Sequence, residues 1–552
     1  MEQVTPRTRS AQGAQQDTER QAGHTLQRRL TWKDAFWVTS GVPAGILFTI
    51  GGVSASIGQP AWAIWIGSIV MGLLQSATYA EISGLFPHKS GGASVYGAMA
   101  WVRYSKTLAP VSVWCNWLAW SPMLALGTGL AANYALTSLF APDAAINTWH
   151  LTLLDLGVIK QGLTLRINAT FVIAAAFLLI TFKLQHSGAS KAAKTQRILG
   201  IASLVPLLIV GIVPFITGDV PAAHLWPLLP LGHDAHGQLT ASRFGAWNGT
   251  GVTMAFGAMF MAGWAAYGFE TAVCYTREFR NPRTDTVKAI FWSGLLCLLV
   301  MTLVPLAFQG ALGTAGMLDP KIVDGTGVAA AMAHMVGGGA LVSAVIVVML
   351  MLSILLIVMT SMMGSSRTLY QASVDGWLPR YLSHVNEHGS PTRAMWTDLG
   401  FNLILLLMSD YMTVLSVSNV CYMIFVFLNL QSGWIHRMDR PNADRPFRCA
   451  RWLLVAGAVC GYLDLAFIGA GADLQGEGTM RNGLIAMLLI VPVFFYRHFW
   501  QDRGRFPARM AQDMQLDDGV PVVDWRRVLP FGALALGVFV VWFSHHLARP
   551  FY

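Results

Sequence analysis

Long apolar stretches recur along almost the whole chain, and short polar loops separate them. Each stretch is about twenty residues long, which matches the roughly 30 Å hydrocarbon thickness of a bilayer at 1.5 Å rise per residue. Residues 340–358 are apolar on every side, whereas a membrane β-barrel would show shorter segments with two-residue alternation. The pattern therefore predicts an all-α bundle of membrane-spanning helices.

The apolar stretches predict thirteen spans, twelve in a core and one further C-terminal span. They lie near 36–59, 61–85, 108–140, 166–183, 196–217, 247–275, 288–312, 338–369, 393–409, 411–435, 451–471, 481–499 and 527–547. The first residues are polar and lack the apolar stretch of a signal peptide. We expect four parts: a disordered cytoplasmic tail (1–32), the helical core (33–500), a basic cytoplasmic linker (501–526) and an additional C-terminal transmembrane helix (527–552).

Composition and charge agree with a membrane protein. Apolar residues make up 54% of the chain and charged residues only 12%, against roughly 25% charged in soluble domains. The net charge of +9 comes from basic residues in short loops, not from one patch, which argues against a nucleic-acid partner. Under the positive-inside rule these loops place the N-terminus in the cytoplasm. The basic loops lie near 89–106, 183–197, 277–288, 367–393, 437–451 and 497–509.

The sequence offers little support for an enzyme or a metal protein. The six cysteines form no Cys-x-x-Cys pair and lie mostly within spans, so we expect core packing, with no disulfide framework and no zinc site. The chain contains no phosphate loop, no His-Glu-x-x-His and no Gly-x-Ser-x-Gly motif. We therefore predict that no cofactor is needed and that the ligand is a small molecule.

Two spans are interrupted near the middle of the bilayer. The first contains glycine and proline at 40–46 (SGVPAGI), and the sixth reads GWAAYGFE at 263–270. Glycines of this kind can also serve helix packing, for example Gly41 and Gly45. Because the two breaks lie five spans apart, they favour a 5+5 inverted repeat in which both breaks form one binding site.

An interrupted helix exposes backbone amides on one side of the break and carbonyls on the other, which suits a zwitterion. We predict that a substrate carboxylate faces the amides around Ala44, Gly45 and Ile46. A substrate amine would face the carbonyls near Ser40 and Gly41. The predicted contribution of the sixth-span break comes from Trp264, Ala265, Tyr267 and Gly268.

Three side chains near the breaks carry candidate chemistry. Trp264 could cover an amine by cation–π contact or close the site, although many tryptophans serve only as packing or interface residues. Glu270 lies within the bilayer, where a carboxylate either pairs with a neighbour or transfers a proton. Glu81 at the inner end of the second span is a second coupling candidate, with a structural role as the favoured alternative.

Three segments resemble the amino acid-polyamine-organocation (APC) superfamily of permeases, which share the fold of the leucine-transporter type. They are 79–87 (YAEISGLFP) with 90–96 (SGGASVY), 267–270 (YGFE) with 277–283 (REFRNPR), and 366–370 (SRTLY) with 375–379 (DGWLP). The resemblance covers about 36–500. It implies proton- or sodium-coupled uptake, or exchange, of amino acids or polyamines across the cell (cytoplasmic) membrane by alternating access.

The chain departs from this family pattern at two positions. Pro43 has no N–H to offer a carboxylate, so the substrate could be another nitrogenous solute that lacks this group. Ser203 stands where some proton-coupled members carry a lysine. Sodium coupling with Ser353 as a weak ligand candidate, proton transfer through Glu270 or Glu81, and plain exchange therefore all remain open. A sensor that retains the transporter fold is the alternative from another class.

Overall fold

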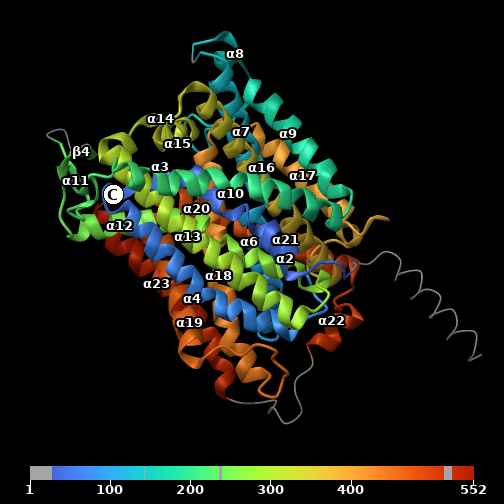
Figure 1. Ribbon diagram of the computed structural model, residues 1–552. Coiled ribbons are helices and arrows are strands. Elements are labelled where there is room, and N and C mark those ends of the chain that lie inside the picture. The colour runs from blue at the N-terminus through green and yellow to red at the C-terminus, as the bar shows by residue number, and fades with distance from the viewer. Residues whose placement is uncertain (1–25, 27, 142, 235–238, 515–524, 552) are drawn as a thin grey trace, which may run out of the picture.

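The computed structural model describes residues 26, 28–141, 143–234, 239–514 and 525–551, and most of them are helical (Figure 1). Within this part of the chain, eleven helical stretches are long and apolar enough to cross a membrane. They confirm eleven of the thirteen predicted spans. Their bounds are Trp32–Ile57, Ala61–Leu85, Ala169–His186, Ala192–Thr217, Gly249–Glu278, Pro282–Met317, Gly339–Val374, Tyr411–Asp439, Arg451–Gly471, Thr479–Gln501 and Leu529–Phe551.

The other two predicted spans coincide with shorter helices. The third consists of α6 (Leu108–Trp120) and α7 (Met123–Leu139), which meet at Pro122. Proline lacks the N–H that a continuous helix would use at this point. The ninth corresponds to α17 (Thr392–Leu406).

Both predicted helix breaks depart from α-helical geometry. In the first span, α2 (Trp32–Thr39) ends before Ser40, and the 3₁₀ segment η1 (Val42–Gly45) precedes α3 (Ile46–Ile57). In the sixth span, α12 (Gly249–Ala266) is followed by the 3₁₀ segment η2 (Gly268–Glu278). The interruptions thus lie where glycine and proline weaken the α-helix. The inverted repeat that would relate them remains a prediction.

The remaining spans carry the following labels: α4 (Ala61–Leu85), α9 (Ala169–His186), α10 (Ala189–Thr217), α13 (Pro282–Met317), α16 (Gly339–Val374), α18 (Tyr411–Asp439), α19 (Arg451–Gly471), α20 (Thr479–Leu488) continuing through α21 (Ile490–Phe495) and a π-helical end (Tyr496–Gln501), and α23 (Leu529–Ala548).

The last helix packs along α19, where the ring of His545 contacts the Gly469 carbonyl at 3.2 Å. Figure 1 shows the two helices side by side. The extra C-terminal helix is therefore packed against the core.

Short elements outside the spans were not predicted. They include two antiparallel hairpins, β1 (His150–Asp155) with β2 (Thr164–Asn168) and β3 (Leu231–His233) with β4 (Leu239–Phe244). Because β2 pairs with β1, the fourth span begins at Ala169 and not at residue 166. Six short α-helices also lie outside the spans: α5 (Ala93–Trp101), α8 (Ala145–Thr148), α11 (Ala222–Leu225), α14 (Pro320–Val323), α15 (Val328–Val336) and α22 (Ala508–Asp513).

The arginine-rich loops lie at one end of the bundle, the basic face. The positive-inside rule predicts that this face is cytoplasmic. Most of the predicted tail, 1–25 and 27, lies outside the described residues, as does 515–524 of the predicted linker. The described end of the tail packs against the sixth span, since the amide of Leu30 donates to the Glu278 carbonyl at 2.9 Å and Leu30 is buried. The ordered bundle therefore starts slightly before residue 32.

Candidate functional site

The two broken helices meet inside the bundle. A Cβ atom added to Gly45 in η1 would lie 3.4 Å from the carbonyl oxygen of Ala265 in α12, in van der Waals contact, so the two broken spans pack directly on each other. On the other side, Gly41 packs against the backbone of α16 near Ile357. The first span thus contacts both the sixth and the eighth, and its contact with the eighth requires glycine at position 41, where a Cβ atom would lie 2.8 Å from the Ile357 nitrogen.

The backbone amides at the first break are paired in this conformation. The Ala44 amide donates to the Gly41 carbonyl at 3.0 Å, and the Ile46 amide donates to the carbonyls of Pro43 and Ala44. The expected set of unpaired amides at these two positions is therefore not present, because the chain tightens into a 3₁₀ turn instead of opening. Ser40 also uses its hydroxyl locally, donating to the Trp37 carbonyl at 2.7 Å.

The sixth-span break is closed by aromatic side chains. Trp264 is only 2% exposed, and its indole N–H donates to the Ala119 carbonyl at 3.4 Å. Its ring meets Phe48 of α3 edge to face, with centroids 6.3 Å apart. A Cβ atom added to Gly268 would lie 2.5 Å from the Trp120 ring. The sequence did not identify Trp120 as part of the site, because its contact with the break is purely tertiary.

Glu270 is a buried carboxylate close to the break. It is 3% exposed, and its Oε1 accepts a hydrogen bond of 3.0 Å from the Tyr422 hydroxyl in α18. Its Oε2 atom makes no hydrogen bond to any described residue. The nearby Tyr267 hydroxyl is likewise buried and unbonded within the described chain. This half-satisfied carboxylate is suited to accept and release a proton.

The serine candidates lie beside the first break. Ser353 in α16 donates to the Ser203 carbonyl in α10 at 3.4 Å, so two positions chosen separately from the sequence are in contact. About two turns further along α16, the Thr360 hydroxyl donates to the Val38 carbonyl of the first span. The Ser361 hydroxyl is buried without a partner among the residues described. These oxygens form a polar strip between the first, fifth and eighth spans.

Glu81 has an environment different from that of Glu270. Its carboxylate accepts two hydrogen bonds from Arg437, at 2.8 and 2.6 Å, and lies 3.2 Å from Arg445. The Cys449 amide also donates to it, at 2.9 Å. Two arginines and an amide leave this carboxylate fully compensated, which favours a structural anchor at the basic face.

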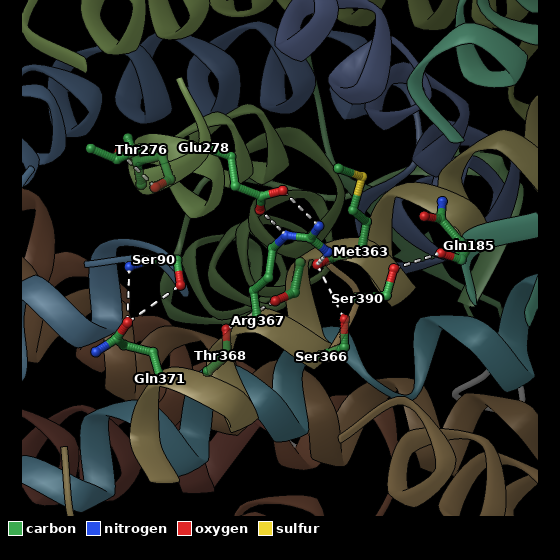
Figure 2. Close-up of polar contacts among 12 residues, drawn as sticks. Ser90, Gln185, Thr276, Glu278, Met363, Ser366, Arg367, Thr368, Gln371 and Ser390 are labelled. Atoms are coloured by element: carbon green, nitrogen blue, oxygen red, sulfur yellow. Dashed lines mark hydrogen bonds and ion pairs between the residues drawn. The ribbon is translucent and has the colours of Figure 1, made fainter. Parts of the chain in front are cut away.

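A buried ion pair closes the basic face below the breaks. Arg367 of α16 donates to Glu278 through two nitrogens, with the Nη2–Oε2 distance at 3.1 Å, and the side chains are 3% and 2% exposed. Figure 2 shows this pair together with the hydrogen bond that the Ser90 amide donates to Gln371 at 3.2 Å. Lys89 adds ion pairs to Asp375 at 2.6 Å and Asp513 at 3.0 Å. These buried contacts join α16, the end of the sixth span and the loop at Lys89 at the basic face.

The multi-span helical bundle and its family resemblance define a membrane transporter and not an enzyme. The chain belongs to the amino acid permease family, whose model matches residues 30–495. This result confirms the expected APC membership.

Similar proteins include the Asc-type amino acid transporter 1 of Mus musculus, which is 23% identical over 491 residues, covering 86% of this chain and 81% of the relative. The branched-chain amino acid permease BcaP of Bacillus subtilis is 23% identical over 415 residues, covering 75% and 77%. BcaP of Lactococcus lactis is 23% identical over 368 residues, covering 64% and 69%. Together with the family match, they identify the chain as an amino acid transporter.

Proposed function

We propose that this protein is a secondary active transporter that binds an amino acid between the breaks of the first and sixth spans and works by alternating access. The observation that carries the proposal is the close contact of the two breaks around Gly45 and Ala265, deep in the bundle. Separating the breaks would free the amides of Ala44 and Ile46 for a substrate carboxylate. The basic face would then be cytoplasmic, and the membrane would be the cell membrane.

The walls of the proposed site favour an apolar substrate side chain. Ala44, Ile46, Phe48, Trp264 and Ala265 are all buried at the contact between the broken helices. Such a surface gains little from a charged substrate side chain, which would have to lose its hydration. We therefore propose a small or branched apolar amino acid, while polyamines and other amines without a carboxylate serve as competitors in the test.

We further propose that transport is coupled to protons through Glu270. Its carboxylate lies just after the break, accepts a hydrogen bond from the uncharged Tyr422 hydroxyl and is not ion-paired to any described cation within 4.0 Å. Substrate binding that moves the sixth span would change the surroundings of this group and so its affinity for a proton. If sodium were the coupling ion instead, with oxygens of the polar strip around Ser203 and Ser353 as its ligands, accumulation would require sodium.

The test is uptake into liposomes that contain the purified full-length protein. An imposed pH gradient, acidic outside, should drive accumulation of radiolabelled leucine or alanine in sodium-free buffer. Accumulation only with sodium would overturn proton coupling and retain transport. Exchange without net accumulation would overturn both forms of coupling. No movement of any amino acid or polyamine under these conditions would overturn the proposed function and favour a sensor.

Two substitutions test the site within the same assay. Trp264→Ala should reduce uptake, because it removes the ring that packs on Phe48 and covers the break. Glu270→Gln should abolish accumulation driven by protons and leave exchange intact. Trp396→Ala is a matched control, since that tryptophan is 56% exposed on α17. Wild-type transport by both site variants would refute the site assignment.

A further inference from the structure

The chain continues past the family-matched region with a segment that packs back onto the basic face. The matched region ends at residue 495, and the segment 501–514 that follows includes α22 (Ala508–Asp513). Figure 1 shows α22 at the same end of the bundle as the start of α2. Met510 of α22 is only 1% exposed. The short helix is therefore docked into the protein and does not lie loosely on its surface.

The acid at the end of α22 pairs with the loop that follows the second span. Asp513 Oδ2 lies 3.0 Å from Lys89 Nζ, and Asp513 Oδ1 lies 3.1 Å from His88 Nε2. Lys89 is 1% exposed and also pairs with Asp375 at the end of α16, at 2.6 Å. A buried ammonium needs close acids because it has lost its hydration. Asp513 therefore helps to hold this lysine, and the loop that carries it, at the basic face.

The segment 501–514 also contacts the ends of two spans. The Arg440 side chain, at the end of α18, donates to the Asp513 carbonyl at 2.6 Å. A Cβ atom added to Gly376, in the turn after α16, would lie 2.6 Å from the Pro507 ring. One short segment thus joins the loop at Lys89 to the ends of the eighth and tenth spans.

The loop held by this segment lies directly on the broken sixth span. The Gly91 amide donates to the Cys274 carbonyl of η2 at 3.1 Å, and a Cβ atom added to Gly92 would lie 2.8 Å from the Cys274 sulfur. On the other side, a Cβ atom added to Gly364 of α16 would lie 3.7 Å from the same sulfur. Because η2 is packed between the loop and α16, it can shift only when the loop moves.

We propose that the segment 501–514 is an autoinhibitory clamp, which holds the loop at 88–92 against η2 and must detach from that loop before the basic face opens. The inference rests on the proposed transport function and adds a regulatory element outside the family-matched region. Asp513 is a positioning residue in this scheme, since it acts through Lys89 and not on the substrate. Its side chain is 13% exposed, so water reaches the ion pairs and they can break while the spans stay folded.

The first test reverses the charge at the end of α22 and measures exposure of the loop's contact on η2. With Cys274 as the only cysteine, Asp513→Lys should increase its reaction rate with a water-soluble maleimide about ten-fold or more, because like charges forced together cost several kcal/mol. Initial uptake by Asp513→Lys should also rise. Asp444→Lys is the matched control: it makes the same charge change at an acid that is 67% exposed and pairs with Arg283, and it should keep the parental labelling rate.

The second test prevents release of the clamp. In a background without native cysteines, His88→Cys combined with Asp513→Cys is joined by a short bis-methanethiosulfonate reagent. Uptake should then fall about ten-fold or more, and reduction should restore it. Each single cysteine variant treated with the same reagent should keep its uptake. A segment that stays docked throughout the cycle would instead leave uptake by the joined protein unchanged.

A parental labelling rate in folded Asp513→Lys would overturn the inference, as would full uptake by the joined double variant or an equal labelling increase in Asp444→Lys. If Asp513→Lys does not fold, the joined pair decides alone, because uptake is compared before and after reduction in one protein. Failure of the proposed function is separate: it would appear as absence of transport in the wild type, while Cys274 labelling would still report release of the clamp.

Discussion

The ion pair between Arg367 and Glu278 joins the eighth span to the end of the sixth, and Arg367→Gln tests whether it holds the basic face closed. The substitution keeps a polar side chain of similar length but removes the charge and the two-nitrogen contact. Glu278 would remain 2% exposed in the closed state, with its countercharge gone. In an opened state water could reach the carboxylate, so the substitution should penalise mainly the closed state.

The size of the effect follows from burial. Breaking a buried, hydrogen-bonded ion pair by removing one partner costs about 3–5 kcal/mol. Since about 1.4 kcal/mol corresponds to a ten-fold change in an equilibrium constant, the open-to-closed ratio should rise by about 100-fold or more. By contrast, Arg380 is paired with Asp502 on the same face but is 64% exposed, and such a pair contributes about 0–1 kcal/mol.

A native cysteine reports the opening. Cys274 is 4% exposed in the closed structure and lies between the loop at Gly92 and α16 near Gly364. With the other five cysteines replaced by alanine, Cys274 should react with a water-soluble maleimide about 100-fold faster in Arg367→Gln. Arg380→Gln should react at the parental rate. An unchanged rate in a folded Arg367→Gln protein, or the same increase in Arg380→Gln, would refute the proposed gate.

Two further predictions concern packing and pH. Gly268→Ala should abolish uptake and lower the melting temperature, because its methyl group would lie 2.5 Å from the Trp120 ring; Gly67→Ala, with no atom within 4 Å, should change neither. Burial opposes ionisation of Asp513, but the hydrogen bond from His88 and the charge of Lys89 lower its pKa to about 2. The difference in melting temperature between wild type and Asp513→Asn should therefore persist from neutral pH to about pH 4 and vanish only near pH 2; loss of the difference by pH 5 would contradict this.

The sequence predicted the spans well because hydrophobic length is a local property. It also located both breaks, since Pro43 and the neighbouring glycines weaken a helix wherever they stand. It did not predict that the first break tightens into a 3₁₀ turn, because that outcome depends on the close packing of Gly45 on Ala265. The β-hairpins were missed for a related reason: short strands in polar loops gain their stability from pairing, which no single segment reveals.

The candidate site was only partly predictable. Trp264 and Glu270 were identified, but Trp120 and Tyr422 contact them from other spans, and sequence spacing contains no such information.

Glu81 and Glu270 show why residue type and depth alone were insufficient. Both are buried acids on spans, and both were coupling candidates, yet Glu81 has two arginines beside it while Glu270 has one tyrosine hydroxyl. Arginines reach acids near the basic face from helix ends and loops, as Arg437 of α18 and Arg445 do for Glu81, whereas Glu270 is paired with an uncharged hydroxyl. Ion pairs should therefore gate the basic face while uncharged donors surround the coupling acid. Because the two sets share no partner, the effects of Arg367→Gln on Cys274 labelling and of Glu270→Gln on accumulation should add independently in the double variant.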